Sequence, residues 1–103
     1  MDKYYKVEIS AETKEQADEI LNSLLSKKLV TGGQIINAPA GFLWKGKVTD
    51  MNYYTINSFT VERHKDAIMT EVSNISIEEV PMIGFYGLDG NDELLKWITD
   101  TVA

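Results

Sequence analysis

The chain contains no cysteine, and His64 is its single histidine among 103 residues. The lack of cysteine excludes disulfide bonds, thiolate metal ligands and a cysteine nucleophile. With one histidine, a metal site with several imidazole ligands cannot form within one chain. No serine lies in a Gly-x-Ser-x-Gly elbow, so the sequence gives no support to serine catalysis.

Basic residues are also scarce. Ten Lys and Arg stand against sixteen Asp and Glu, for a formal net charge of −6. This balance argues against nucleic-acid binding, which usually needs a basic face. Residues 62–103 carry nine acidic and three basic residues, so the C-terminal part presents an acidic surface. Residues 29–61 carry only three charged residues, which indicates burial of this segment.

The chain has no long hydrophobic run. The longest, Val80 to Leu88, includes one proline and two glycines and is far too short to span a bilayer. The N-terminal residues lack the apolar core of a signal peptide. We therefore expect no membrane association and a soluble, cytoplasmic protein. The length and a hydrophobic content of 44% predict one globular domain over residues 1–103.

The hydrophobic pattern predicts an alternation of strands and helices. Period-two patterns predict strands over 3–9, 51–61 and 79–86. Helical spacing predicts helices over 13–28 and 63–75, and a third helix capped by Asn91. Thr13 and Gln16 fit a capping box at the start of the first helix.

The charge-poor segment from Leu29 to Val48 has no helical period. It predicts a long strand with a break or bulge near Pro39, because proline removes a donor from the strand ladder. This strand is expected to pair with the next one in an antiparallel hairpin whose turn lies near residues 49–51.

The resulting order, βαββαβ with a C-terminal helix, predicts an α+β, ferredoxin-like fold with an antiparallel sheet. Two helices would cover one face of this sheet. Tyr54, Ile56 and Phe85 or Tyr86 are expected on the other face, where they would meet water. An exposed apolar face and a long hairpin with open edges both favour an oligomer.

Three short motifs carry a resemblance to a known family. They are Trp44-Lys45-Gly46-Lys47-Val48, preceded by Phe42; Glu79-Val80-Pro81; and Gly90-Asn91, followed by Leu95 and Trp97-Ile98. In this order and spacing, the chain resembles the CutA family, small trimeric proteins named for divalent cation tolerance. The resemblance covers nearly the whole chain.

Two departures mark the chain as a divergent member. Residues 31–34 read Thr-Gly-Gly-Gln where the family has Ala-Cys-Val-Asn, and residues 76–78 read Ser-Ile-Glu where it has His-Pro-Tyr. The natural ligands of a soft metal ion are therefore missing at these positions. Copper or zinc binding through them is not carried over to this chain.

The resemblance implies a homotrimer that is not an enzyme, with clefts between subunits. The motif positions make Trp44, Lys47, Glu79 and Tyr86 the candidate lining of a ligand cleft. A divalent cation is the candidate ligand, with Glu79, Asp50 and His64 as its candidate binding residues.

Each candidate also has a structural interpretation. His64 between Arg63 and Lys65 fits a surface residue, and Glu79 fits a structural hydrogen bond or ion pair. Lys45 and Lys47 could dock an anion, or belong to a turn at the hairpin tip. Residues 32–33 are both glycine, but no Lys-Ser/Thr follows them, so they fail the phosphate-loop pattern.

Two other functions remain open at this point. The first is a small-molecule sensor similar to the PII signalling trimers, which would bind a nucleotide between subunits and need several basic residues there. The second is a structural trimer that scaffolds a protein partner through its acidic C-terminal part.

Overall fold

The computed structural model describes residues 3–102. The elements follow the predicted order: β1 (Tyr4–Ala11), α1 (Lys14–Ser26), β2 (Gly33–Trp44), β3 (Lys47–Val61), a 3₁₀ turn (Glu62–His64), α2 (Lys65–Ile75), β4 (Ile83–Gly87) and α3 (Asp92–Thr101). The α+β, ferredoxin-like fold with a C-terminal helix is confirmed.

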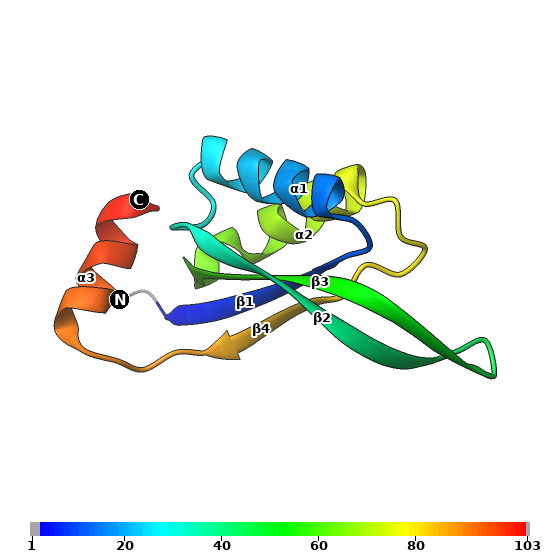
Figure 1. Ribbon diagram of the computed structural model, residues 1–103. Helices are drawn as coiled ribbons and strands as arrows, with labels where there is room; N and C mark the ends of the chain where they lie inside the picture. The colour runs from blue at the N-terminus through cyan, green and yellow to red at the C-terminus, as the bar shows by residue number, and fades with distance from the viewer. Residues whose placement is uncertain (1–2, 103) are drawn as a thin grey trace.

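The four strands form one sheet in the order β2-β3-β1-β4, and all neighbours are antiparallel. Helices α1 and α2 lie side by side on one face of this sheet, whereas α3 lies at the end of the sheet opposite to the hairpin tip (Figure 1). The molecule is elongated along the hairpin, with principal extents of 44 × 24 × 20 Å.

The main core lies between the sheet and helices α1 and α2. Its fully buried members alternate along β1 and repeat at helical spacing along the two helices, as the sequence predicted; they include Val7, Ile9, Ile20, Leu24, Ile68 and Val72. A second, smaller core joins the ends of β1 and β3 to α3 through Val61, Ile98 and Val102. This second core attaches the C-terminal helix to the sheet.

The expected composition of the open face is wrong in part. Ile56 is fully buried in the main core, and Tyr54 and Phe85 pack against that core. The register explains this placement, because Ile56 is paired with Ile9 and cross-strand partners point to the same face. Of the expected residues, only Tyr86 stays outside this core, with 53% of its surface exposed.

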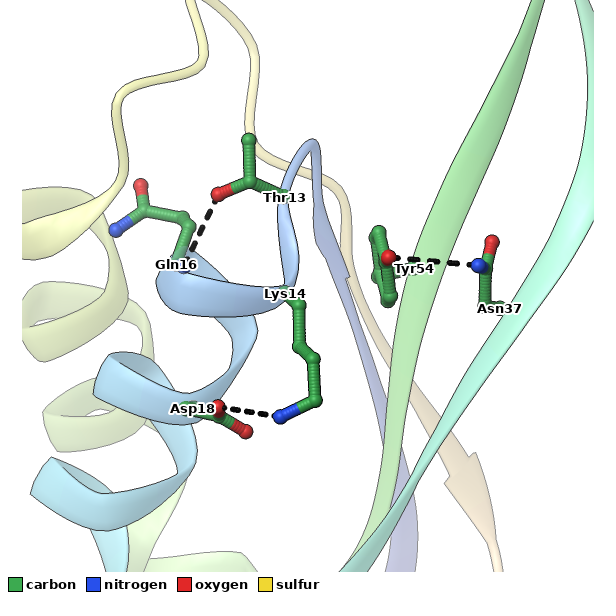
Figure 2. A network of polar contacts seen from close by, with 6 residues as sticks. All are labelled: Thr13, Lys14, Gln16, Asp18, Asn37 and Tyr54. Atoms are coloured by element: carbon green, nitrogen blue, oxygen red, sulfur yellow. Dashed lines mark hydrogen bonds and ion pairs between the residues drawn. The ribbon is translucent and has the colours of Figure 1, made fainter.

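The start of α1 shows how a predicted cap is made. The Thr13 hydroxyl accepts a hydrogen bond from the Gln16 backbone N–H at 3.1 Å (Figure 2). The Gln16 side chain does not complete the capping box. Its carbonyl oxygen accepts from the Ile77 N–H at 2.5 Å, and its amide donates to Glu19. Gln16 therefore ties α1 to the segment that follows α2.

The hairpin turn lies at Lys45-Gly46, which confirms the interpretation of Lys45 and Lys47 as residues of the tip, whereas the predicted turn near residues 49–51 is wrong. Trp44 and Lys47 form the last cross-strand pair, so the loop has two residues. Lys45 and Gly46 both have positive φ, 50° and 79°, which matches a two-residue turn whose twist follows that of the strands. The predicted break near Pro39 is also wrong. β2 runs unbroken because it is an edge strand, where a missing N–H is tolerated.

Strand β4 begins at Ile83, four residues later than the predicted start at Glu79. The preceding residues approach β1 without joining the ladder. The Ser10 N–H donates to the Met82 carbonyl at 2.9 Å, and the Met82 N–H donates to the Ser10 hydroxyl at 2.9 Å. Pro81 has no N–H to donate to the ladder, which helps to explain why β4 begins only after it. Residues 78–82 therefore form a connecting segment, which we call the β4-entry segment.

Candidate functional site

A groove of about 420 Å³ lies between the outer half of the β2–β3 hairpin and the β4-entry segment. The hairpin contributes Phe42, Leu43, Trp44, Thr49, Met51 and Tyr53. The β4-entry segment contributes Glu78, Glu79, Val80 and Met82, and Glu12, which follows β1, completes the lining. The groove thus combines apolar and aromatic side chains of the hairpin with three carboxyl groups.

The groove exists because the hairpin is longer than the strand beside it. β1 ends at Ala11, which is paired with Tyr54 of β3. Seven further cross-strand pairs, from Ala38 with Tyr53 to Trp44 with Lys47, continue the hairpin without a β1 neighbour. Side chains of this outer half, such as Trp44 and Tyr53, therefore lie beside the β4-entry segment where a longer β1 would otherwise run.

Glu78 is the most firmly held acid of the groove. Its carboxylate accepts hydrogen bonds from the Ser10 hydroxyl, at 2.5 Å, and from the Tyr53 hydroxyl. Its backbone N–H donates to the Ser76 hydroxyl at 3.1 Å. Because Ser10 lies on β1 and Tyr53 on β3, these bonds attach the β4-entry segment to two strands of the sheet.

Tyr53 is kept in its protonated form. Burial, followed by the hydrogen bond to Glu78, raises the pKa of the Tyr53 phenol from 10.0 to about 12. The phenol therefore remains a hydrogen-bond donor throughout the physiological range. Its ring also packs edge-to-face against Phe42, with 5.0 Å between the centroids, so the aromatic side of the groove is continuous.

Glu79 and Trp44, both predicted cleft residues, line this groove together. Lys45, at the turn, connects them. Its ammonium lies 3.0 Å from Glu79 Oε2 and 5.4 Å from the centroid of the Trp44 ring. The Lys45 and Glu79 side chains are 64% and 65% exposed, so this ion pair contributes little to stability.

The two other predicted cleft residues do not line the groove. Lys47 is the cross-strand partner of Trp44, but it is not among the lining residues. Tyr86 lies on β4, paired with Lys6, and the groove does not extend to it.

Asp50 lies in a different hollow. This open depression of about 490 Å³ is formed by the middle of the hairpin, and its lining consists of residues 39–41 and 50–52. Glu79 does not take part in it.

His64 lies at the α3 end of the molecule. Its Nε2 atom is 2.6 Å from the Val102 carbonyl, which can only accept, so Nε2 carries the proton. The Arg63 guanidinium donates to the same carbonyl at 3.3 Å. His64 is thus partly buried and bonded to the end of α3 through Nε2, and its role as a metal ligand stays a prediction.

Asp50, Glu79 and His64 are therefore not brought together within the subunit. Across residues 3–102, no three His, Cys, Asp or Glu side chains are arranged to hold a metal ion. An ion site that uses all three residues therefore cannot form within the described part of one chain.

The sequence analysis did not single out Glu12, Tyr53 or Ser10 as parts of the site, and it did not place Glu78 in the predicted cleft. Tyr53 was assigned only to an alternating strand, and Ser10 was not singled out. The one local signal for Glu78 is its position next to Glu79, which the motifs did select. Locating its partners requires the register that places Tyr53 next to the end of β1.

No helix within residues 3–102 is both long enough and apolar enough to cross a membrane.

Comparison with known proteins gives a consistent result. Residues 5–101 match the family described as CutA1 divalent ion tolerance protein. A search of curated protein sequences finds no match. The solved structure of the periplasmic divalent cation tolerance protein CutA from Archaeoglobus fulgidus is similar, with a TM-score of 0.92 and 27% identity, covering 97% of this chain and 99% of that one.

Two further structures share the fold. CutA1 from Ehrlichia chaffeensis has a TM-score of 0.91 at 22% identity, covering 100% of this chain and 98% of that one. CutA1 from Oryza sativa has a TM-score of 0.91 at 21% identity, covering 98% of this chain and 94% of that one. The motifs of the hairpin turn, the β4-entry segment and α3 all fall within the matched range. The chain therefore belongs to the CutA1 divalent ion tolerance family.

Proposed function

We propose that the chain acts in divalent cation tolerance as a homotrimer that catalyses no reaction and binds its ion or small ligand in clefts between subunits. Family membership supports the general role, and the similar proteins from Ehrlichia chaffeensis and Archaeoglobus fulgidus are described as divalent ion or cation tolerance proteins. The trimer, the cleft and the absence of catalysis rest on the arguments that follow.

The observation that carries the proposal is the exposed apolar surface around the hairpin tip. Leu43 and Val48 are cross-strand partners there, and they are 77% and 79% exposed. Ile77 and Val80, on the neighbouring connection, are 65% and 59% exposed. Apolar side chains gathered at a projecting element are typical of a surface that another protein covers.

The edge of the sheet gives a second reason for assembly. β2 is an edge strand of twelve residues, and its outer hydrogen-bonding groups have no neighbouring strand within residues 3–102. Edges of this length are usually paired or covered. A closed symmetric ring of identical chains covers every such edge and every hairpin tip at once.

The groove lies directly beside this surface, because Leu43 and Val80 belong to both. A neighbouring subunit that covers the tip would also enclose the groove and add side chains to it. The proposed cleft therefore consists of Trp44 and Glu79 from one subunit, with Lys47 and Tyr86 as candidates from the same or the adjacent one.

The chemistry of the groove supports binding rather than catalysis. The only histidine of the chain is hydrogen-bonded to the Val102 carbonyl at the α3 end, so no imidazole base reaches the groove. The Ser10 hydroxyl is occupied by Glu78 and by the Met82 N–H.

Native mass spectrometry of the purified chain tests the proposal, first alone and then with Cu²⁺, Zn²⁺, Mg²⁺ or ATP. A trimer that retains a divalent ion is the expected result. A trimer that retains ATP would instead favour the PII-like sensor. A trimer that retains none of these would argue against ligand binding, and a monomer would overturn the assembly.

A further inference from the structure

The groove combines three carboxylates with an aromatic wall. Its lining includes the carboxylates of Glu12, Glu78 and Glu79 and the rings of Phe42, Trp44 and Tyr53. Among the described residues that line the groove, none is Lys, Arg or His. An anion would be repelled here. A cation would be attracted by the carboxylates and by the faces of the rings.

The arrangement favours an organic cation over a bare metal ion. As stated above, the acids of residues 3–102 form no three-ligand cluster. Aromatic faces contribute nothing as metal ligands, whereas they bind ammonium groups and cover alkyl chains. A volume of about 420 Å³ lies within the usual range of small-molecule sites.

A lysine of the chain shows which kind of cationic group the mouth of the groove accepts. The Lys45 ammonium lies between the Glu79 carboxylate, at 3.0 Å, and the Trp44 ring, at 5.4 Å from its centroid. A primary alkylammonium group is thus already bound at the mouth of the groove. Because both charged side chains are about two-thirds exposed, this contact is weak and open to exchange.

Deeper in the groove, Glu78 is positioned without a cation. The two hydrogen bonds that its carboxylate accepts within residues 3–102 come from the neutral hydroxyls of Ser10 and Tyr53. These bonds fix the carboxylate in place and leave its negative charge uncompensated. A preorganised carboxylate of this kind binds a cation with little further loss of conformational freedom.

We infer that the groove binds a small organic cation with primary alkylammonium groups, held by Glu78 and Glu79 and covered by the Trp44 ring. This inference rests on the proposed function, since it names the class of ligand that enters the proposed cleft. Lys45 then acts as a tethered competitor, and its ammonium leaves Glu79 when the ligand enters.

The test uses cadaverine, a flexible diamine, and pentanediol, its uncharged counterpart of equal length. The full chain is titrated in its native oligomeric form, with Trp97→Phe so that Trp44 is the only tryptophan. Trp44 fluorescence and calorimetry follow binding. We expect cadaverine to saturate below about 10 mM and pentanediol not to bind.

Variants locate the site. Glu78→Gln should weaken cadaverine binding about tenfold or more, because a charge-assisted contact is lost. Lys45→Gln should strengthen binding by up to about fivefold, because the competing ammonium is removed. Glu93→Gln, on the α3 helix, removes a carboxylate outside the groove and is the matched control. Glu79→Gln, at an exposed position, keeps the test valid where Glu78→Gln disturbs the fold.

The outcomes separate this inference from the proposed function. Equal binding of pentanediol, no binding of cadaverine, or binding unchanged by both Glu78→Gln and Glu79→Gln would overturn the inference. A trimer that holds a divalent metal ion but no cadaverine would retain the proposed function and reject the organic cation. A monomer that binds cadaverine would retain the organic cation and reject the trimer of the proposed function.

Discussion

The Tyr53 hydroxyl donates a hydrogen bond to the Glu78 carboxylate and so joins two residues that lie 25 positions apart in the chain. Tyr53 lies on β3, at the first hairpin pair beyond the end of β1, and Glu78 begins the β4-entry segment. This single contact connects both sides of the groove. The geometry of the site therefore depends on the attachment of a connecting segment as much as on the sheet.

Removing the Tyr53 hydroxyl tests this dependence. We expect Tyr53→Phe to lower the free energy of unfolding by about 1 kcal/mol, the usual net contribution of one hydrogen bond. Amide hydrogen exchange of residues 77–82 should become faster, whereas exchange in α3 should not change. Tyr86→Phe removes a hydroxyl from a half-exposed position outside the groove and serves as the control. Equal exchange rates in wild type and Tyr53→Phe would show that Glu78 is held without Tyr53.

The same phenol predicts a dependence of stability on alkaline pH. The pKa of Tyr53 is raised in the folded state to about 12 from 10.0, so the folded chain holds this proton more tightly than the unfolded chain. The contribution of this protonated phenol to the free energy of unfolding is complete below pH 10 and is lost as the pH rises toward 12. Urea unfolding across this interval should show a steeper loss of stability for wild type than for Tyr53→Phe. Parallel curves of stability against pH for the two proteins would contradict a raised pKa of Tyr53 in the folded state.

The sequence predicted the fold through periodicity and the site only in part. Helices α1 and α2 follow from residues such as Ile20 and Ile68, whose spacing matches one helical face. Trp44 and Glu79, selected from separate motifs, line the same groove, and their role in binding stays a prediction. In β3, by contrast, both alternating sets carry apolar bulk, so the pattern could not tell which set faces the helices. Only the pairing of Ile56 with Ile9 decides this.

The hairpin turn was misplaced for a related reason. The turn signal at Lys45-Gly46 is short, and a positive φ at a lysine is not visible in a hydrophobic pattern. Glu12 and Ser10 were missed because each becomes part of the site only through contacts with a distant segment. Such contacts are a property of the tertiary arrangement and have no local sequence signal.

Gly33 is a position where even one methyl group should disturb the sheet. A Cβ atom there would lie 2.6 Å from the backbone oxygen of Asn57, which belongs to the paired strand and cannot move alone. We expect Gly33→Ala to destabilise the chain by about 1–3 kcal/mol in urea unfolding. Gly41→Ala is the matched control on the same strand. Its Cβ would meet only the Asp50 side chain, at 3.2 Å, and the stability should change little.

The apolar hairpin tip predicts the response of the assembly to a new charge. Val48→Glu places a carboxylate on a side chain that is 79% exposed in the subunit, so the subunit itself should fold normally. In the proposed trimer the same carboxylate would be buried against a neighbour at a high desolvation cost. Light scattering should therefore show dissociation to smaller species. Met69→Glu, on α2, is the control and should leave the mass unchanged. A trimeric Val48→Glu variant would place the interface elsewhere.

The two interpretations of His64 make different predictions. If its Nε2–H bond to the Val102 carbonyl is its main role, His64→Ala should lower the free energy of unfolding by about 1 kcal/mol. Hydrogen exchange should then become faster at the end of α3 and stay unchanged in the hairpin. Asn74→Ala, at an exposed position of α2, should show neither effect. The metal interpretation requires three copies of His64 to meet on a threefold axis, and in that case the variant trimer would lose bound Zn²⁺ in native mass spectrometry. The Nε2–H bond leaves Nδ1 open to a metal ion, so the Zn²⁺ content is what separates the two interpretations. Because no group of three His, Cys, Asp or Glu side chains within residues 3–102 could hold an ion, we expect the Zn²⁺ content to be the same for wild type and His64→Ala.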